Sequence, residues 1–146
     1  MSIREATLND LDALARLFDN YRIFYRKPPE LTAAKKFLQQ RITGKESVIF
    51  LAGENYAVAF AQLYPLFSST RMKRLWLLND LFVDPDFRGK GISKLLLSRC
   101  FQLARETNAC GVMLETERDN MIANQLYRKT GFQLMESNFY FYENPG

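Results

Sequence analysis

The sequence predicts an α/β protein built around a mixed sheet, and three observations carry this prediction. Residues 75–83 are mostly large and apolar, contain no Gly or Pro, and end just before Pro85, which is typical of a buried strand. A short glycine-containing turn then leads into an amphipathic stretch, which predicts a helix over about residues 91–107. A second apolar run, residues 111–116, follows at the spacing of a parallel β-α-β unit.

Two helices and three strands are expected up to residue 83. A strand over residues 3–6 precedes a helix that Asn9 or Asp10 caps and that runs to about residue 24. A second helix covers about residues 32–41. Strands over 47–52, 56–64 and 75–83 form an antiparallel meander, with a polar loop over 65–73. The inward-facing residues predicted for the two helices are Leu8, Leu11, Leu14, Phe18, Tyr21, Ala33, Phe37 and Leu38.

The C-terminal part is expected to hold one more helix and a hairpin. Asn120 is a suitable cap for a helix that runs to about residue 129, and Gly131 suits its C-terminal end. Strands over residues 132–135 and 138–142 then close the sheet. The predicted order is β-α-α-β-β-β-α-β-α-β-β, in one domain over residues 1–146.

Composition excludes several classes of function. The chain is 47% hydrophobic and 25% charged, as in globular proteins, and it has neither a run of about 20 apolar residues nor an apolar leader. It has no His, which removes His-based triads and His-containing zinc sites, and no metal site is expected. Two cysteines, both expected to be reduced, predict a cytoplasmic protein. The net charge of +4 is dispersed, so we expect no nucleic-acid partner and no membrane partner.

The turn between the predicted strand and helix is suited to an anion. The first N–H groups of a helix lack intrahelical acceptors, and the helix dipole adds partial positive charge there. Gly89 and Gly91 have no Cβ, so a bulky anion can approach the backbone closely, and Arg88 and Lys90 add full charges. The turn therefore predicts a phosphate or pyrophosphate site.

The spacing of the turn excludes two common nucleotide motifs. Gly91 is followed by Ile92 rather than by the Lys of a Walker loop, and Lys94 occupies the third glycine position of a dinucleotide fingerprint. What remains is Arg-x-x-Gly-x-Ser, which resembles the Arg/Gln-x-x-Gly-x-Gly/Ala loop of the GNAT N-acetyltransferase superfamily. Ser93 is a mild departure from that pattern. The resemblance implies that the pyrophosphate of acetyl-CoA binds at Arg88, Gly89, Lys90, Gly91, Ile92 and Ser93.

A second motif supports the same family. Residues 120–132 are similar to the GNAT pattern Asn-x-x-Ala-x-x-x-Tyr-x-x-x-Gly-Phe, and the strand order is that of the GNAT fold. By resemblance, Tyr127 is the general acid that protonates the leaving thiolate, and it contacts the cofactor; a Tyr hydroxyl is a competent donor. Its ring packing against the sheet is the structural alternative. Asn120 resembles the residue that hydrogen-bonds the cofactor, and it also suits a helix cap.

The general base is less well determined by sequence. Some GNAT enzymes place Glu on the central strand where this chain has Asn79, which cannot take a proton. The adjacent Asp80 is our candidate, provided that a bulge turns it to the appropriate side of the sheet. Glu115, Glu117 and a water chain are the alternatives. The resemblance also implies that backbone N–H groups of Leu81, Phe82 and Val83 bind the pantetheine and the reaction's oxyanion.

The resemblance implies direct acetyl transfer from acetyl-CoA to a primary amine of a small, amino-acid-like molecule. Acceptor recognition is expected from Tyr21, Phe24, Tyr25 and Arg26, from residues 67–73 and from residues 138–142. The alternatives are a protein or peptide N-acetyltransferase and a catalytically silent acyl-CoA sensor, which Asn79 keeps open. A homodimer is expected from the family alone.

Overall fold

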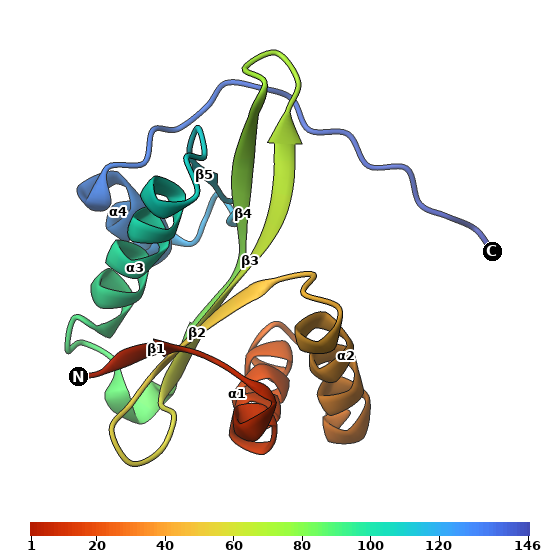
Figure 1. The fold of residues 1–146 in the computed structure, drawn as a ribbon, viewed down its shortest axis with the longest axis vertical. Helices are drawn as coiled ribbons and strands as arrows, with labels where there is room; N and C mark the ends of the chain where they lie inside the picture. The colour runs from red at the N-terminus through yellow and green to blue at the C-terminus, as the bar shows by residue number, and fades with distance from the viewer. The chain divides into compact units, whose positions relative to one another are not determined.

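Five strands form one mixed sheet in the order β1-β2-β3-β4-β5 in the computed structural model, which describes residues 1–146 (Figure 1). Strands β1 to β4 pair antiparallel, whereas β4 and β5 pair parallel, as the predicted β-α-β unit requires. The strands span Ile3–Glu5, Val48–Ala52, Ala59–Ser68, Lys73–Val83 and Val112–Met113.

The chain divides into two compact units, Met1–Glu115 and Thr116–Gly146, and each is described by itself. The first unit holds the sheet and three α-helices: α1 (Leu11–Phe24), α2 (Leu31–Thr43) and α3 (Ile92–Glu106). The second unit holds α4 (Met121–Thr130). None of the helices has the length and apolar character that crossing a membrane requires.

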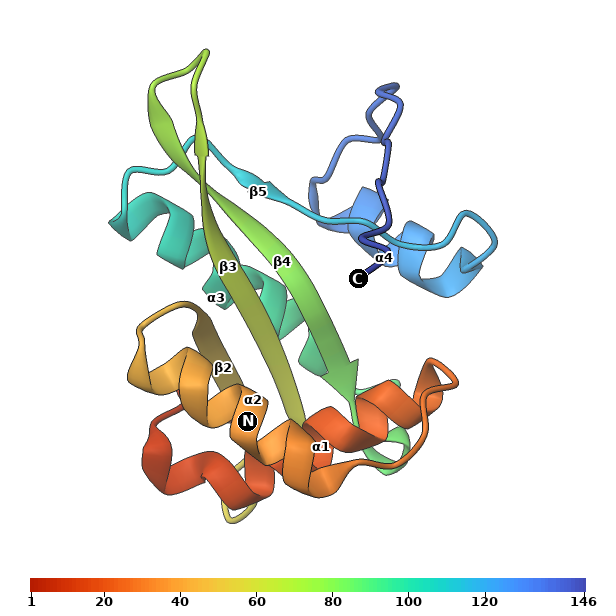
Figure 2. The ribbon, with the colours of Figure 1, turned by 90° about the vertical axis from the view of Figure 1, so that its right-hand side faces the viewer.

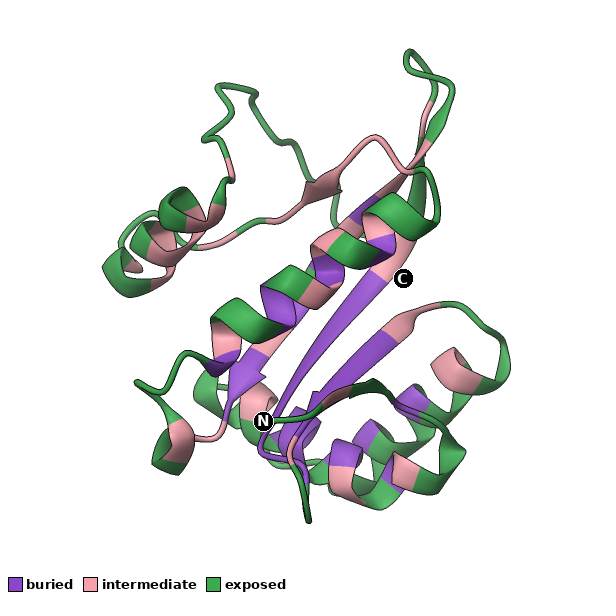
Figure 3. Cartoon of the chain, turned by 60° about the vertical axis from the view of Figure 1, so that its left-hand side comes forward, coloured by how far each residue is buried: buried purple, intermediate pink, exposed green.

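Helices cover both faces of the sheet in the first unit. Figures 1 and 2 show α1 and α2 side by side on one face and α3 on the other. Phe60 and Phe82 point to the α1 face, where each ring lies about 6 Å from that of Tyr21. Phe50 and Trp76 point to the α3 face: the Arg99 guanidinium stacks over Phe50, and the Trp76 indole N–H donates to Thr107. The strands are buried where the helices cover them (Figure 3).

The N-terminal helix cap differs in part from the prediction. Asp10 occupies the N-cap position of α1, as one of the two predicted residues, but its side chain makes no cap hydrogen bond there; Thr7 instead caps the 3-10 turn over Leu8–Asp10 that precedes α1. The Thr7 hydroxyl accepts from the Asn9 N–H, and the Asp10 carboxylate accepts from the Thr7 N–H at 2.9 Å, which makes a capping box.

The predicted helix faces are mostly confirmed. Leu11, Leu14, Phe18 and Leu38 are buried. Leu8, in the 3-10 turn, is half-exposed, and Ala34 rather than Ala33 faces the core. Phe37 is partly exposed, with its ring stacked on Phe18 and the Arg41 guanidinium over the ring.

The predicted polar loop over 65–73 is also partly wrong, because β3 and β4 continue as a hairpin to Ser68 and Lys73. Pro65 is tolerated inside β3 because β2 pairs only as far as Leu63, so the backbone of Pro65 has no second neighbouring strand to donate to.

The predicted C-terminal strands are absent. Residues 132–146 form no strand, and Phe139, Tyr140, Phe141 and Tyr142 are 77–87% exposed. The aromatic pattern has strand propensity, but a strand is stable only with a ladder partner and a buried face, and this segment has neither. The last strand predicted before it, residues 111–116, is shortened to β5.

Candidate active site

Strand β4 contains an extra residue at Asn79. Gln62 pairs with Asp80, whereas the next residue of β3, Leu63, pairs with Leu78, so Asn79 has no partner on β3. This is a β-bulge, and it reverses the side on which all later residues of β4 lie. Trp76 therefore points to α3, whereas Asp80 lies with Phe82 on the α1 face.

Asp80 is buried and held by several side chains. It is 4% exposed, and its Oδ2 accepts a 2.7 Å hydrogen bond from the Gln62 amide Nε2. Its Oδ1 accepts from the Asn79 amide at 3.1 Å, and the Tyr21 hydroxyl also hydrogen-bonds the carboxylate. The same hydroxyl donates to the Asn79 carbonyl at 3.4 Å. Residues of α1, β3 and the bulge thus converge on one carboxylate.

Burial raises the pKa of Asp80, and the hydrogen bonds from Gln62, Tyr21 and Asn79 oppose that rise. A carboxylate with a raised pKa is a stronger base than an exposed one. Nearby, burial and the charge of Asp80 raise the pKa of Tyr64 to about 12, so this phenol stays neutral. The other candidate bases, Glu115 and Glu117, are exposed.

The turn before α3 has the backbone conformation that glycine provides. Gly89 and Gly91 have φ values of +77° and +79°, in the left-handed region that residues with a Cβ rarely adopt. A Cβ built on either glycine would meet nothing within 4 Å, so the space above both is open. No side chain caps α3, and its first N–H groups face this space without an intrahelical acceptor. These features fit the pyrophosphate of acetyl-CoA.

The two basic side chains of the turn lie against aromatic rings. The Arg88 Nε donates to the Val83 carbonyl at 3.0 Å, and its guanidinium lies 5.1 and 5.4 Å from the ring centres of Phe24 and Phe82. The Lys90 ammonium lies 5.2 Å from the centre of the Phe87 ring. These contacts keep both cations near the turn, and the contact of Arg88 with Phe24 links the turn to the end of α1.

The second half of β4 has one edge without a neighbouring strand. Strand β5 pairs only with Trp76 and Leu77, so residues 78–83 are paired on the β3 side alone. In an extended strand, successive N–H groups point to alternate edges. Among Leu81, Phe82 and Val83, the main chain can therefore donate to a ligand that lies along this edge.

Aromatic rings gather where α1 ends beside this half of β4. Tyr21 and Tyr25 meet edge-to-face with ring centres 5.1 Å apart, and Phe24 lies 6.2 Å from Phe82. Three of the residues expected to recognise the acceptor, Tyr21, Phe24 and Tyr25, are thus brought together near Asp80. Arg26 follows them with a positive φ of 66°.

The second unit contains Asn120 and Tyr127. The Asn120 side chain accepts from the Ala123 N–H at 3.2 Å, which confirms the predicted cap of α4, and Gly131 ends the helix with φ +110°. Tyr127 is half-buried, and its ring lies edge-to-face with Phe132 at 5.5 Å.

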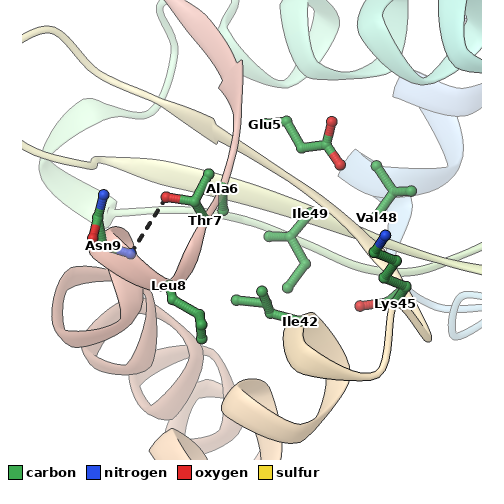
Figure 4. A pocket seen from close by; sticks show the side chains of 10 residues that line it. Glu5, Ala6, Thr7, Leu8, Asn9, Ile42, Lys45, Val48 and Ile49 are labelled. Atoms are coloured by element: carbon green, nitrogen blue, oxygen red, sulfur yellow. Dashed lines mark hydrogen bonds between the residues drawn. The ribbon is translucent and has the colours of Figure 1, made fainter.

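A separate groove of about 550 Å³ lies at the corner between β1, β2 and the end of α2 (Figure 4). Half of its lining residues are aliphatic, and the other half are polar or charged: Glu5, Thr7, Asn9, Lys45 and Ser47. It contains none of the predicted site residues.

The two cysteines are free, as expected. Cys100 is fully buried in α3, and burial raises the pKa of its thiol to about 12. A thiol in that state does not act as a nucleophile near neutral pH.

Gln62 is the residue of this buried cluster that sequence reasoning missed. It is fully buried, donates to Asp80, and accepts a 2.8 Å hydrogen bond from the Ser47 hydroxyl. The signal was present: Gln62 is the one polar residue in the apolar run of residues 57–63. A polar side chain in a buried strand requires a partner.

Comparisons with known proteins show the family of the chain and its fold. The model of the acetyltransferase (GNAT) family matches residues 11–132. The uncharacterized N-acetyltransferase YhfO of Bacillus subtilis (strain 168) is 45% identical over 134 residues, which cover 91% of this chain and 90% of that protein. A crystal structure of a probable acetyltransferase is 41% identical, with a TM-score of 0.90 over 99% of this chain and 97% of that one.

A predicted acetyltransferase from Clostridium acetobutylicum, solved with acetyl-CoA, shares the fold at a TM-score of 0.80 and 20% identity, over 97% of this chain and 95% of that one.

Proposed function

Because this chain belongs to the acetyltransferase (GNAT) family, whose acyl donor is acetyl-CoA, we propose that it acetylates a primary amine of a small, amino-acid-like molecule by direct transfer. One observation carries the acceptor assignment. The bulge at Asn79 puts the Asp80 carboxylate on the α1 face beside Tyr21, whose ring meets Tyr25, which in turn meets Phe24, a setting suited to an amine with an apolar body.

The first unit contributes the groups that would hold the acyl donor. The N–H groups at the start of α3, with Gly89, Gly91, Arg88 and Lys90, would bind the pyrophosphate. Ile92 and Ser93 form the first turn of α3. The free edge of β4 at residues 81–83 would bind the pantetheine. By family resemblance, Asn120 would hydrogen-bond the cofactor. Bound there, acetyl-CoA supplies an acyl group activated as a thioester.

The chain's own residues then move the protons. Asp80, whose pKa burial raises, accepts the proton that the attacking amine gives up. Backbone N–H groups of residues 81–83 stabilise the negative charge that develops on the acetyl oxygen. The Tyr127 hydroxyl donates a proton to the departing sulfur. The buried Cys100, with its raised pKa, supports direct transfer without an acetylated cysteine.

The test removes one proton-transfer group at a time. Tyr127→Phe and Asp80→Asn are assayed with a panel of primary amines by following thiol release from acetyl-CoA. We expect each to lower kcat by about 10²- to 10⁴-fold, because general acid or base help has that size, with the acetyl-CoA Kd changed less than about twofold. Tyr56→Phe, which removes an exposed hydroxyl in the β2–β3 turn, is the matched control.

Unchanged turnover in Tyr127→Phe would show that Tyr127 is not the general acid. Unchanged turnover in Asp80→Asn would show that Asp80 is not the general base. A wild type that binds acetyl-CoA but acetylates no member of a broad amine and peptide panel would favour the sensor alternative.

A further inference from the structure

We propose that Gln62 is a positioning residue, which holds the Asp80 carboxylate toward the acceptor and favours its ionised form, and that Ser47 acts behind it. The inference rests on the proposed role of Asp80 as base. It adds two residues, on β3 and just before β2, that touch no substrate but act through that carboxylate.

The three side chains form a directed chain of hydrogen bonds. The Ser47 hydroxyl donates to the Gln62 Oε1 at 2.8 Å, and the Gln62 Nε2 donates to the Asp80 Oδ2 at 2.7 Å. A Gln amide has one acceptor end and one donor end. Because Ser47 occupies the acceptor end, the donor end faces Asp80.

The backbone register places this chain. Gln62 is directly opposite Asp80 in the β3–β4 ladder, at the last regular pair before the bulge. Directly opposite residues have side chains on the same face and within contact distance. The bulge that turns Asp80 to the α1 face therefore also brings it against Gln62.

A structural role alone does not account for a polar residue at this position. Gln62 is fully buried and pairs with Ile49 of β2, among apolar neighbours such as Phe60. An apolar side chain would fill the site without the desolvation of an amide. The amide adds a hydrogen-bond donor for Asp80. Without it, fewer hydrogen bonds would stabilise the buried negative charge of this carboxylate.

The groups facing Asp80 are otherwise uncharged near neutral pH. Tyr21 comes from α1, Tyr64 from β3 and Asn79 from β4 itself. The positive charge of Arg41 in α2 lowers the pKa of Tyr64, against the larger effect of burial. Of the hydrogen bonds that lower the pKa of Asp80, the one from Gln62 has the largest effect. Removing this donor is expected to raise the pKa of Asp80 further, so that less of it is ionised at acid and neutral pH.

The experiment compares pH profiles of kcat/KM for the wild type, Gln62→Met and Ser47→Ala, with an amine that the wild type acetylates. Met has nearly the volume of Gln but no N–H donor. We expect the acid limb of Gln62→Met to move to higher pH, with kcat/KM about tenfold lower on that limb, since a hydrogen bond to a charged group has that worth. Ser47→Ala should shift the limb in the same direction by less.

Thr107→Val is the matched control, because it removes a hydroxyl that accepts a hydrogen bond from the Trp76 indole N–H on the opposite face of the sheet. It should lower stability without moving the limb. As a readout that needs no acceptor, the ¹³C carboxyl resonance of Asp80, identified by its loss in Asp80→Asn, is titrated in each protein. Its midpoint should rise in Gln62→Met.

Three results would overturn the proposal. A uniform loss of kcat/KM at all pH values in Gln62→Met, with an unmoved limb, would mark Gln62 as merely structural while Asp80 stays the base. An unchanged midpoint of the Asp80 ¹³C titration in Gln62→Met would lead to the same conclusion, and this measurement requires no activity assay. Full activity of Asp80→Asn would remove the base itself and this proposal with it. If Gln62→Met does not fold, Ser47→Ala carries the same comparison.

Discussion

Replacing Gly91 by Ala tests the cofactor loop most directly. The residue has φ +79°, where an L-residue costs about 1–2 kcal/mol. A Cβ there meets no atom within 4 Å, so no clash adds to this cost. For a chain of this length, 1 kcal/mol lowers Tm by about 2–4 °C.

The same strain arises in Gly131→Ala, because Gly131 has φ +110° at the end of α4 and its Cβ also meets nothing within 4 Å. The two variants should therefore lose similar stability. Only Gly91→Ala places a methyl group over the uncapped start of α3, where the pyrophosphate must approach the backbone.

Isothermal titration of acetyl-CoA into each folded variant separates the two effects. We expect Gly91→Ala to bind at least about tenfold more weakly, a loss of roughly 1.4 kcal/mol, and Gly131→Ala to bind within about twofold of the wild type. Equal affinities in all three proteins, or equal losses in both variants, would refute the assignment of this turn.

Two further predictions concern stability. Because the folded-state pKa of Asp80 is raised, the wild type should lose stability as pH rises from the unfolded value of about 4 through the folded value. Asp80→Asn lacks this dependence. Measured by urea unfolding, the free energy of unfolding of the variant should therefore rise relative to that of the wild type as pH increases. A difference in unfolding free energy that does not change with pH would contradict this. Thr7→Ala removes the capping box and should cost about 1 kcal/mol. Thr32→Ala on the exposed side of α2 is its control, and equal thermal shifts in the two variants would argue against the cap.

Local patterns predicted the elements whose signals are local. The apolar run ending at Val83 and the helical spacing from Ile92 placed β4 and α3 nearly to the residue, and the glycines between them marked the turn that joins the two elements. The cap of α4 at Asn120 was equally visible, because the residue type and the helix start coincide.

Pairing between distant segments was less visible. Nothing in the order Leu78-Asn79-Asp80 reveals which of these residues lacks a pairing partner on β3. The side of the sheet to which Asp80 points therefore depended on a bulge that only the strand pairing shows. Gln62 acquires its meaning from the same register. The C-terminal aromatics had strand propensity, but propensity does not supply a ladder partner.

The extra residue in β4 lets one strand serve two hydrophobic layers in succession, α3 at its beginning and α1 at its end. Insertions and deletions are usually tolerated in loops and rarely in strands. Here the loss of Asn79 alone would turn Asp80 and Phe82 to the α3 face, or else Trp76 and Leu78 away from it. A one-residue deletion at this position would thus act as several simultaneous core substitutions, and evolution can exchange the side chain at 79 far more readily than it can remove the residue.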